Sequence, residues 1–186
     1  MKKLTLSILT CLIFLSPNVV LSETLSDLVE RKGLWFKKFT EVPFTGKIIG
    51  RSQGAIKNGR REGAWVEYHK NGQLWSKSSF KNGKIEGASV VYHKNGQLQA
   101  KGNLKNGERE GPWVWYHDNG QLMLKGNFKN GKEEGAPVVY NDNGELRLEG
   151  NWKNGKTEGD WVYYNKDGTV YMKLTGTYKD GKKISD

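Results

Sequence analysis

The chain has 186 residues, a formal net charge of +10, one cysteine and 24 glycines, nearly twice the ordinary glycine share of about 7%. Seven Trp, eight Tyr and six Phe are too many for a disordered chain, whereas 35% hydrophobic residues and a mean hydropathy of −0.73 disfavour a large enzyme core. The length suits one domain or one array of small repeats.

Residues 1–22 have the layout of a secretory signal peptide. Lys2 and Lys3 precede an apolar stretch over residues 4–15, and Val20 and Ser22 supply small residues at the −3 and −1 positions. We therefore predict cleavage near Ser22 and a periplasmic or extracellular location.

Two other interpretations of this segment are rejected. A retained membrane anchor needs roughly 18 or more apolar residues, and polar residues interrupt this stretch. A lipoprotein would need a small residue before Cys11, but Thr10 precedes it. Cleavage would remove the only cysteine, so the mature chain would hold no disulfide and no cysteine nucleophile, and its net charge would fall to +8.

Residues 23–56 differ in composition from the rest of the chain, and we expect them to form an N-terminal cap. From residue 57 the sequence repeats every 24 residues, which is typical of stacked repeat architectures. The five units of residues 57–178 share a Lys-Asn-Gly triplet, two further glycines and one tyrosine; the tyrosines are Tyr68, Tyr92, Tyr116, Tyr140 and Tyr164. Residues 179–186 are polar and are predicted to form a C-terminal cap.

Each unit is predicted to be a β-hairpin. Asn-Gly pairs favour type I′ turns, because both central residues need positive φ. We place the tight turn at Asn71-Gly72 and a longer connection over residues 81–87. The predicted fold class is all-β: an elongated, single-layer antiparallel meander of stacked β-hairpin repeats.

The core face follows from residue alternation along each strand. In unit three we assign to the core the residues whose types recur in the other units: Val114, Tyr116, Leu122, Leu124, Gly126 and Phe128.

Large aromatic residues recur in every second unit on the face opposite Val114 and Tyr116, whereas units two and four have Ser89 and Pro137 there. They either fill the concave side of a twisted sheet or form a row of anchors for a protein or glycan partner. The candidate binding face consists of Trp65, Trp75, Trp113, Trp115, Trp161 and Tyr163.

Recurring ionisable residues give no catalytic or metal site. His69, His93 and His117 occupy one position in successive units, about 9–10 Å apart, which is too far for a shared zinc ion. The acids at the position of Glu62 each lie near a basic residue, so we expect a solvated mixed-charge loop. We predict no enzyme activity, no cofactor and no metal.

The spacing over residues 126–135, Gly-Asn-Phe-Lys-Asn-Gly-Lys-Glu-Glu-Gly, resembles the MORN repeat, although Leu124 stands where a tyrosine usually opens the motif. The chain looks most like the bacterial MORN-repeat variant family, whose members are often labelled antitoxin components of toxin–antitoxin modules. The resemblance covers residues 57–178 and implies a β-hairpin array that binds partners and has no catalytic machinery.

We therefore expect an exported, non-enzymatic scaffold that binds a protein or an envelope component. The alternative is an antitoxin-like protein that neutralises a partner toxin. Net positive charge lies in the first half of the mature chain, which indicates weak attraction to an anionic surface. Nucleic acid is not an expected partner, because the positive region is short and the chain is predicted to be exported.

Overall fold

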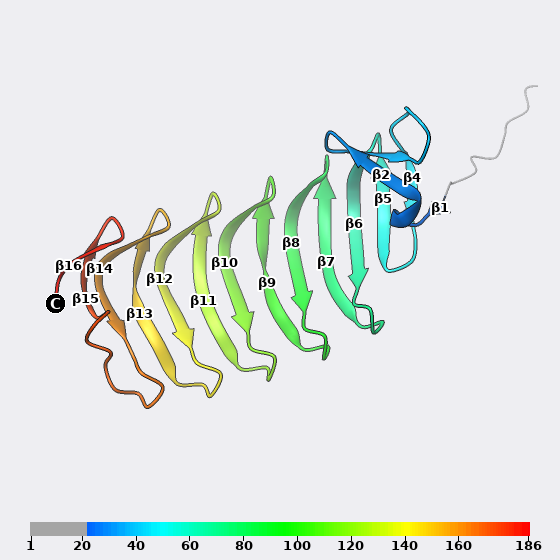
Figure 1. Cartoon of the computed structure of the whole chain (residues 1–186). Coiled ribbons are helices and arrows are strands. Elements are labelled where there is room, and N and C mark those ends of the chain that lie inside the picture. The colour runs from blue at the N-terminus through cyan, green and yellow to red at the C-terminus, as the bar shows by residue number, and fades with distance from the viewer. Residues whose placement is uncertain (1–21) are drawn as a thin grey trace, which may run out of the picture.

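A computed structural model describes residues 22–186, so the predicted signal peptide, apart from Ser22, lies outside the described residues. In this part of the chain one open sheet of 14 strands runs as a meander, antiparallel throughout except where β1 pairs with β4 (Figure 1). The predicted fold class is confirmed. The strands of the sheet are β1 (Ser22–Glu23), β4 (Gly46–Ile48), β5 (Ser52–Lys57), β6 (Arg60–Tyr68), β7 (Leu74–Lys81), β8 (Lys84–Tyr92), β9 (Leu98–Lys105), β10 (Glu108–Tyr116), β11 (Leu122–Lys129), β12 (Lys132–Tyr140), β13 (Leu146–Lys153), β14 (Lys156–Tyr163), β15 (Gly176–Lys179) and β16 (Lys182–Ser185).

The two connections of each unit are the reverse of the predicted ones. Asn82 and Gly83 have φ of 52° and 82° and form the tight turn between β7 and β8. At Asn71-Gly72 only the glycine has positive φ, because the His69 N–H donates to the Gln73 carbonyl oxygen and closes a longer loop. Asn-Gly occurs at both ends of the strands, so the dipeptide alone could not identify the tight turn.

A glycine bulge bends the first strand of each unit. At Gly63, with φ of 70°, the register between β5 and β6 shifts. Arg61 and Glu67 are six residues apart, which is about 20 Å in an extended strand, yet their charged groups form an ion pair at 3.1 Å. The face that carries these side chains is therefore concave, and we call it the trough.

The core lies on the trough face, and the predicted core is wrong in part. Trp113 pairs with Gly126 and Trp115 with Leu124, so the tryptophans share a face with Leu124 and the buried Phe128. Val114 pairs with Lys125 on the opposite, convex face. Alternation separated the two faces correctly in β10, but it could not show which residues of β10 share a face with those of β11, because a bulge shifts the register between them.

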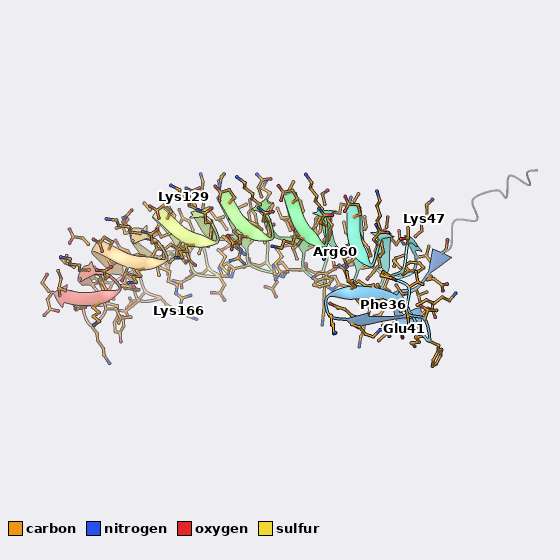
Figure 2. All side chains as sticks on the ribbon, turned by 90° about the horizontal axis from the view of Figure 1, so that it is seen from above. Phe36, Glu41, Lys47, Arg60, Lys129 and Lys166 are labelled. Atoms are coloured by element: carbon orange, nitrogen blue, oxygen red, sulfur yellow. The ribbon has the colours of Figure 1, made fainter. Side chains whose placement is uncertain are left out.

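The N-terminal segment covers one end of the trough. It contains a short 3-10 helix, η1 (Leu25–Asp27), and the two-stranded hairpin β2 (Leu28–Arg31) and β3 (Leu34–Lys37). Leu28 and Phe44 form one buried cluster with Ile56 and Trp65 of the sheet. In Figure 2 this hairpin lies against one side of the sheet near β5 and β6. Within residues 22–186, the large sheet thus has a second layer only at its N-terminal end.

The C-terminal end continues the sheet. After Tyr164 a longer connection leads to β15, and the hairpin of β15 and β16 adds two short strands. Within the described residues, none of the helical segments has the length and apolar character needed to cross a membrane.

Candidate binding surfaces

The structure buries three of the six predicted site residues. The side chains of Trp65, Trp113 and Trp161 are 2%, 5% and 1% exposed. Each indole covers a glycine on the preceding strand, and each Nε1–H donates to a backbone carbonyl oxygen at 2.9–3.1 Å. These three tryptophans pack the trough, so the expected row of exposed anchors is reduced to Trp75, Trp115 and Tyr163.

The other three predicted residues keep part of their surface exposed. Trp115 stacks on Trp113 with ring centroids 5.4 Å apart, and Tyr163 stacks on Trp161 at 5.9 Å. Burial, with a smaller effect of Tyr178, raises the pKa of the Tyr163 phenol. Trp75 is 43% exposed and lies beside the His69 ring rather than against the other tryptophans. Five of the six predicted rings therefore lie in the trough, and Trp75 lies apart from them.

Side-chain packing explains why large aromatic residues recur in every second unit. Trp113 and Phe128 form a buried cluster with Ala100 of unit two, and Val91 packs against this cluster. In unit two Ser89 replaces the tryptophan, and its hydroxyl is hydrogen-bonded to that of Ser78 at 2.9 Å. Small residues in the even units thus leave room for the large rings of the odd units.

An arginine lies over the aromatic rings in units one and three. The guanidinium carbon of Arg61 is 4.4 Å from the centre of the Trp65 ring, and that of Arg109 is 5.1 Å from the centre of the Trp115 ring. Cation–π attraction favours this geometry. The sequence analysis missed both arginines, although their 48-residue spacing matches that of the paired tryptophans.

The three histidines link successive units. One ring nitrogen of each lies 2.9–3.1 Å from the carbonyl oxygen of the tyrosine one unit later. We call this row of links the histidine ladder. The side-chain N–H groups of Asn71, Asn95 and Asn119 likewise donate to backbone carbonyl oxygens one unit later. Across residues 22–186, no three His, Cys, Asp or Glu side chains gather as metal ligands would.

The recurring acids also link units, a role that the sequence analysis missed. Glu86 accepts a hydrogen bond from the backbone N–H of Asn106 in the following turn at 2.7 Å, and the equivalent acids of all five units do the same. The offset from acid to turn, 20 residues in units one to four and 22 in unit five, was visible in the sequence, but the pairing required the register of the sheet.

The convex face carries a cross-strand row in which valine alternates with lysine. The row passes through Lys77, Lys101 and Lys125, all exposed, and continues through Glu149 to Val162. Successive lysines are two strands, or about 9–10 Å, apart. The positive charge of this row therefore lies on β7, β9 and β11, in the middle of the sheet.

Residues 61–82, 85–106 and 109–130 match the sequence model of the MORN repeat variant. These three segments, about a third of the chain, are similar to MORN repeats. No curated protein matches the chain. Among solved structures, the "Crystal structure of GtfA/B complex bound to UDP and GlcNAc" is similar over 83% of this chain and 27% of that chain, with 15% identity and a TM-score of 0.22. The chain thus spans about a quarter of that protein, and so low a score carries no argument about function.

Proposed function

We propose that the protein is an exported, non-enzymatic scaffold that binds a protein partner in its trough. MORN repeats generally serve as protein- or membrane-binding elements, which is compatible with this role. One observation carries the proposal: the N-terminal segment of the chain packs on the trough at Trp65, whereas the buried cluster around Trp113, within the described residues, contains only residues of the sheet. The trough thus accommodates protein side chains at one end, and its uncovered part can accept those of a partner.

Site-specific photocrosslinking in the native cell tests this proposal. We would place p-benzoylphenylalanine at Trp115 in the trough and, as a matched control, at Lys125 on the convex face. We expect a protein adduct from position 115 and none from position 125, with the chain recovered in the periplasm or the medium. Equal adducts from both positions, or recovery of an uncleaved chain in the cytosol, would contradict the proposal.

The lysine row of the convex face favours a second candidate function, attachment to an anionic envelope surface. The exposed side chains of Lys77, Lys101 and Lys125 would each be attracted to an anionic surface, and added salt would screen this attraction. Binding to phosphatidylglycerol vesicles should fall steeply with added salt and should weaken when the three lysines are replaced by glutamine. Binding that ignores salt, or none at low salt, would exclude this candidate.

An antitoxin-like role is the alternative form of the scaffold proposal. In that case the trough would hold a toxin, and a toxin gene should neighbour this one. Co-expression with the neighbouring gene product should restore growth with the wild-type chain. A neighbouring product that is harmless alone would exclude the alternative.

A further inference from the structure

Arg61 and Arg109 occupy the same position in units one and three but have different electrostatic surroundings. Arg61 is paired with Glu67, and its side chain is 21% exposed. At the position of Glu67, unit three has Trp115, and among the described residues no carboxylate lies within ion-pair distance of Arg109.

The guanidinium of Arg109 is held by aromatic rings alone. Its carbon lies 5.1–5.3 Å from the centres of Trp113, Trp115 and Phe128. Glu133, which pairs with Phe128 across the sheet, has its carboxylate beside Gly155 of the next unit. Arg109 is exposed, so a partner can reach its N–H donors.

The N-terminal hairpin shows what the trough accepts. A cavity of about 270 Å³ at unit one is lined by Glu30 and Trp35 of the hairpin and by Arg61 and Phe80 of the sheet. At unit one the hairpin thus contributes an aromatic residue and a glutamate to the cavity that Arg61 also lines, while the carboxylate paired with Arg61 is that of Glu67. The equivalent surface at unit three, Arg109 with Phe128, has no such covering within the described residues.

We infer that the partner of the trough is a protein segment that places an apolar side chain against Trp115 and a carboxylate on Arg109. The inference rests on the proposed function and adds the chemistry of the partner. An arginine offers two parallel N–H donors to a carboxylate, and such pairs are stronger when aromatic neighbours exclude water.

A cyclic peptide probe tests the inference on the intact chain. The probe copies residues 28–37, which carry Leu28, Glu30 and Trp35, with the basic residues at 31, 32 and 37 replaced by Ser, Asn and Gln so that Glu30 is its only charge. A companion peptide has glutamine in place of the glutamate. Titration of both peptides into the wild-type chain and into Arg109→Gln completes a double-mutant cycle.

We expect the acidic probe to bind the wild-type chain about tenfold more tightly than it binds Arg109→Gln, and about tenfold more tightly than the glutamine peptide binds the wild-type chain. The glutamine peptide should bind Arg109→Gln about as weakly as either of these singly changed pairs. Trp115→Glu should also remove binding, because it installs the ion pair of unit one. Lys129→Gln is the matched control: this exposed lysine of β11 lies outside the lysine row, so the change should leave binding unchanged. Circular dichroism and the unfolding midpoint establish that each variant is folded.

Two results would overturn the inference: no binding of the acidic probe to the folded wild-type chain, or equal binding to wild type and Arg109→Gln. The crosslinking experiment separates this outcome from failure of the proposed function. If the adduct from position 115 forms equally well in Arg109→Gln, the trough is still a binding site, but its partner does not use a carboxylate to bind Arg109. Loss of the adduct in that variant supports both.

Discussion

The indole of Trp113 covers the backbone of Gly102 on the neighbouring strand β9, and its Nε1–H donates to the Asn103 carbonyl oxygen at 2.9 Å. A β-carbon at residue 102 would overlap the ring. The same pairing recurs between Gly54 and Trp65 and between Gly150 and Trp161. None of these three glycines has positive φ, so backbone conformation does not require glycine there. Glycine is needed because the ring of the tryptophan lies so close to the backbone.

Gly102→Ala should therefore lower the free energy of unfolding by about 1–3 kcal/mol, the usual cost of overpacking a core. Gly126→Ala is the control, because its added carbon would meet the Leu124 side chain at 3.4 Å and Pro137 only at 4.0 Å. We expect that change to lie within about 0.5 kcal/mol of wild type. Urea unfolding followed by tryptophan fluorescence measures both. Equal costs at the two sites would contradict the close-approach argument.

Trp113→Ala should cost about 3–5 kcal/mol, because it removes a buried ring and leaves a cavity in a single-layer sheet. Trp75→Ala should cost about 1 kcal/mol or less, since that ring is 43% exposed. The denaturation midpoints of the two variants give the comparison. A large loss from Trp75→Ala would show that this ring supports the fold.

The histidine ladder stops at unit four, where Asn141 replaces histidine and its buried side-chain nitrogen has no hydrogen-bond partner among residues 22–186. Asn141→His should restore the link to the Tyr164 carbonyl oxygen and raise stability by about 0.5–1.5 kcal/mol. Asn165→His is the matched control: Asn165 already donates to the Thr169 hydroxyl at 3.0 Å, so we expect no gain there. Thermal unfolding measures the shift. A destabilised Asn141→His variant would refute the ladder as a source of stability.

Removing one of the recurring acids that link successive units should weaken the contact between those units. Glu86→Ala leaves the Asn106 N–H without its acceptor and should cost about 1 kcal/mol. Glu108→Ala removes an exposed acid beside the same turn that accepts no side-chain hydrogen bond within the described residues, and should be nearly neutral. Hydrogen exchange at the Asn106 amide should accelerate in the first variant alone. Unchanged exchange would mean that the carboxylate does not protect this amide.

Repetition in the sequence was sufficient to predict the array of hairpins. The 24-residue spacing of Gly83, Gly107 and their equivalents gave the size of the unit, and alternation in β10 placed Val114 and Trp115 on opposite faces. These features are local, because turn chemistry and side-chain alternation act within a few residues of the chain.

Only the tertiary structure decided which face is the core and what is left for a partner. The bulge at Gly111, in register with Phe128, bends β10 until Arg109 reaches Trp115, and that curvature turns a flat row of aromatic residues into a filled trough. The register between strands depends on contacts between different strands, such as that of the Trp113 Nε1–H with the Asn103 carbonyl oxygen, which no pattern within one strand reports. The sequence thus determined the repeat and its alternation, whereas packing across strands buried Trp113 and left Arg109 exposed.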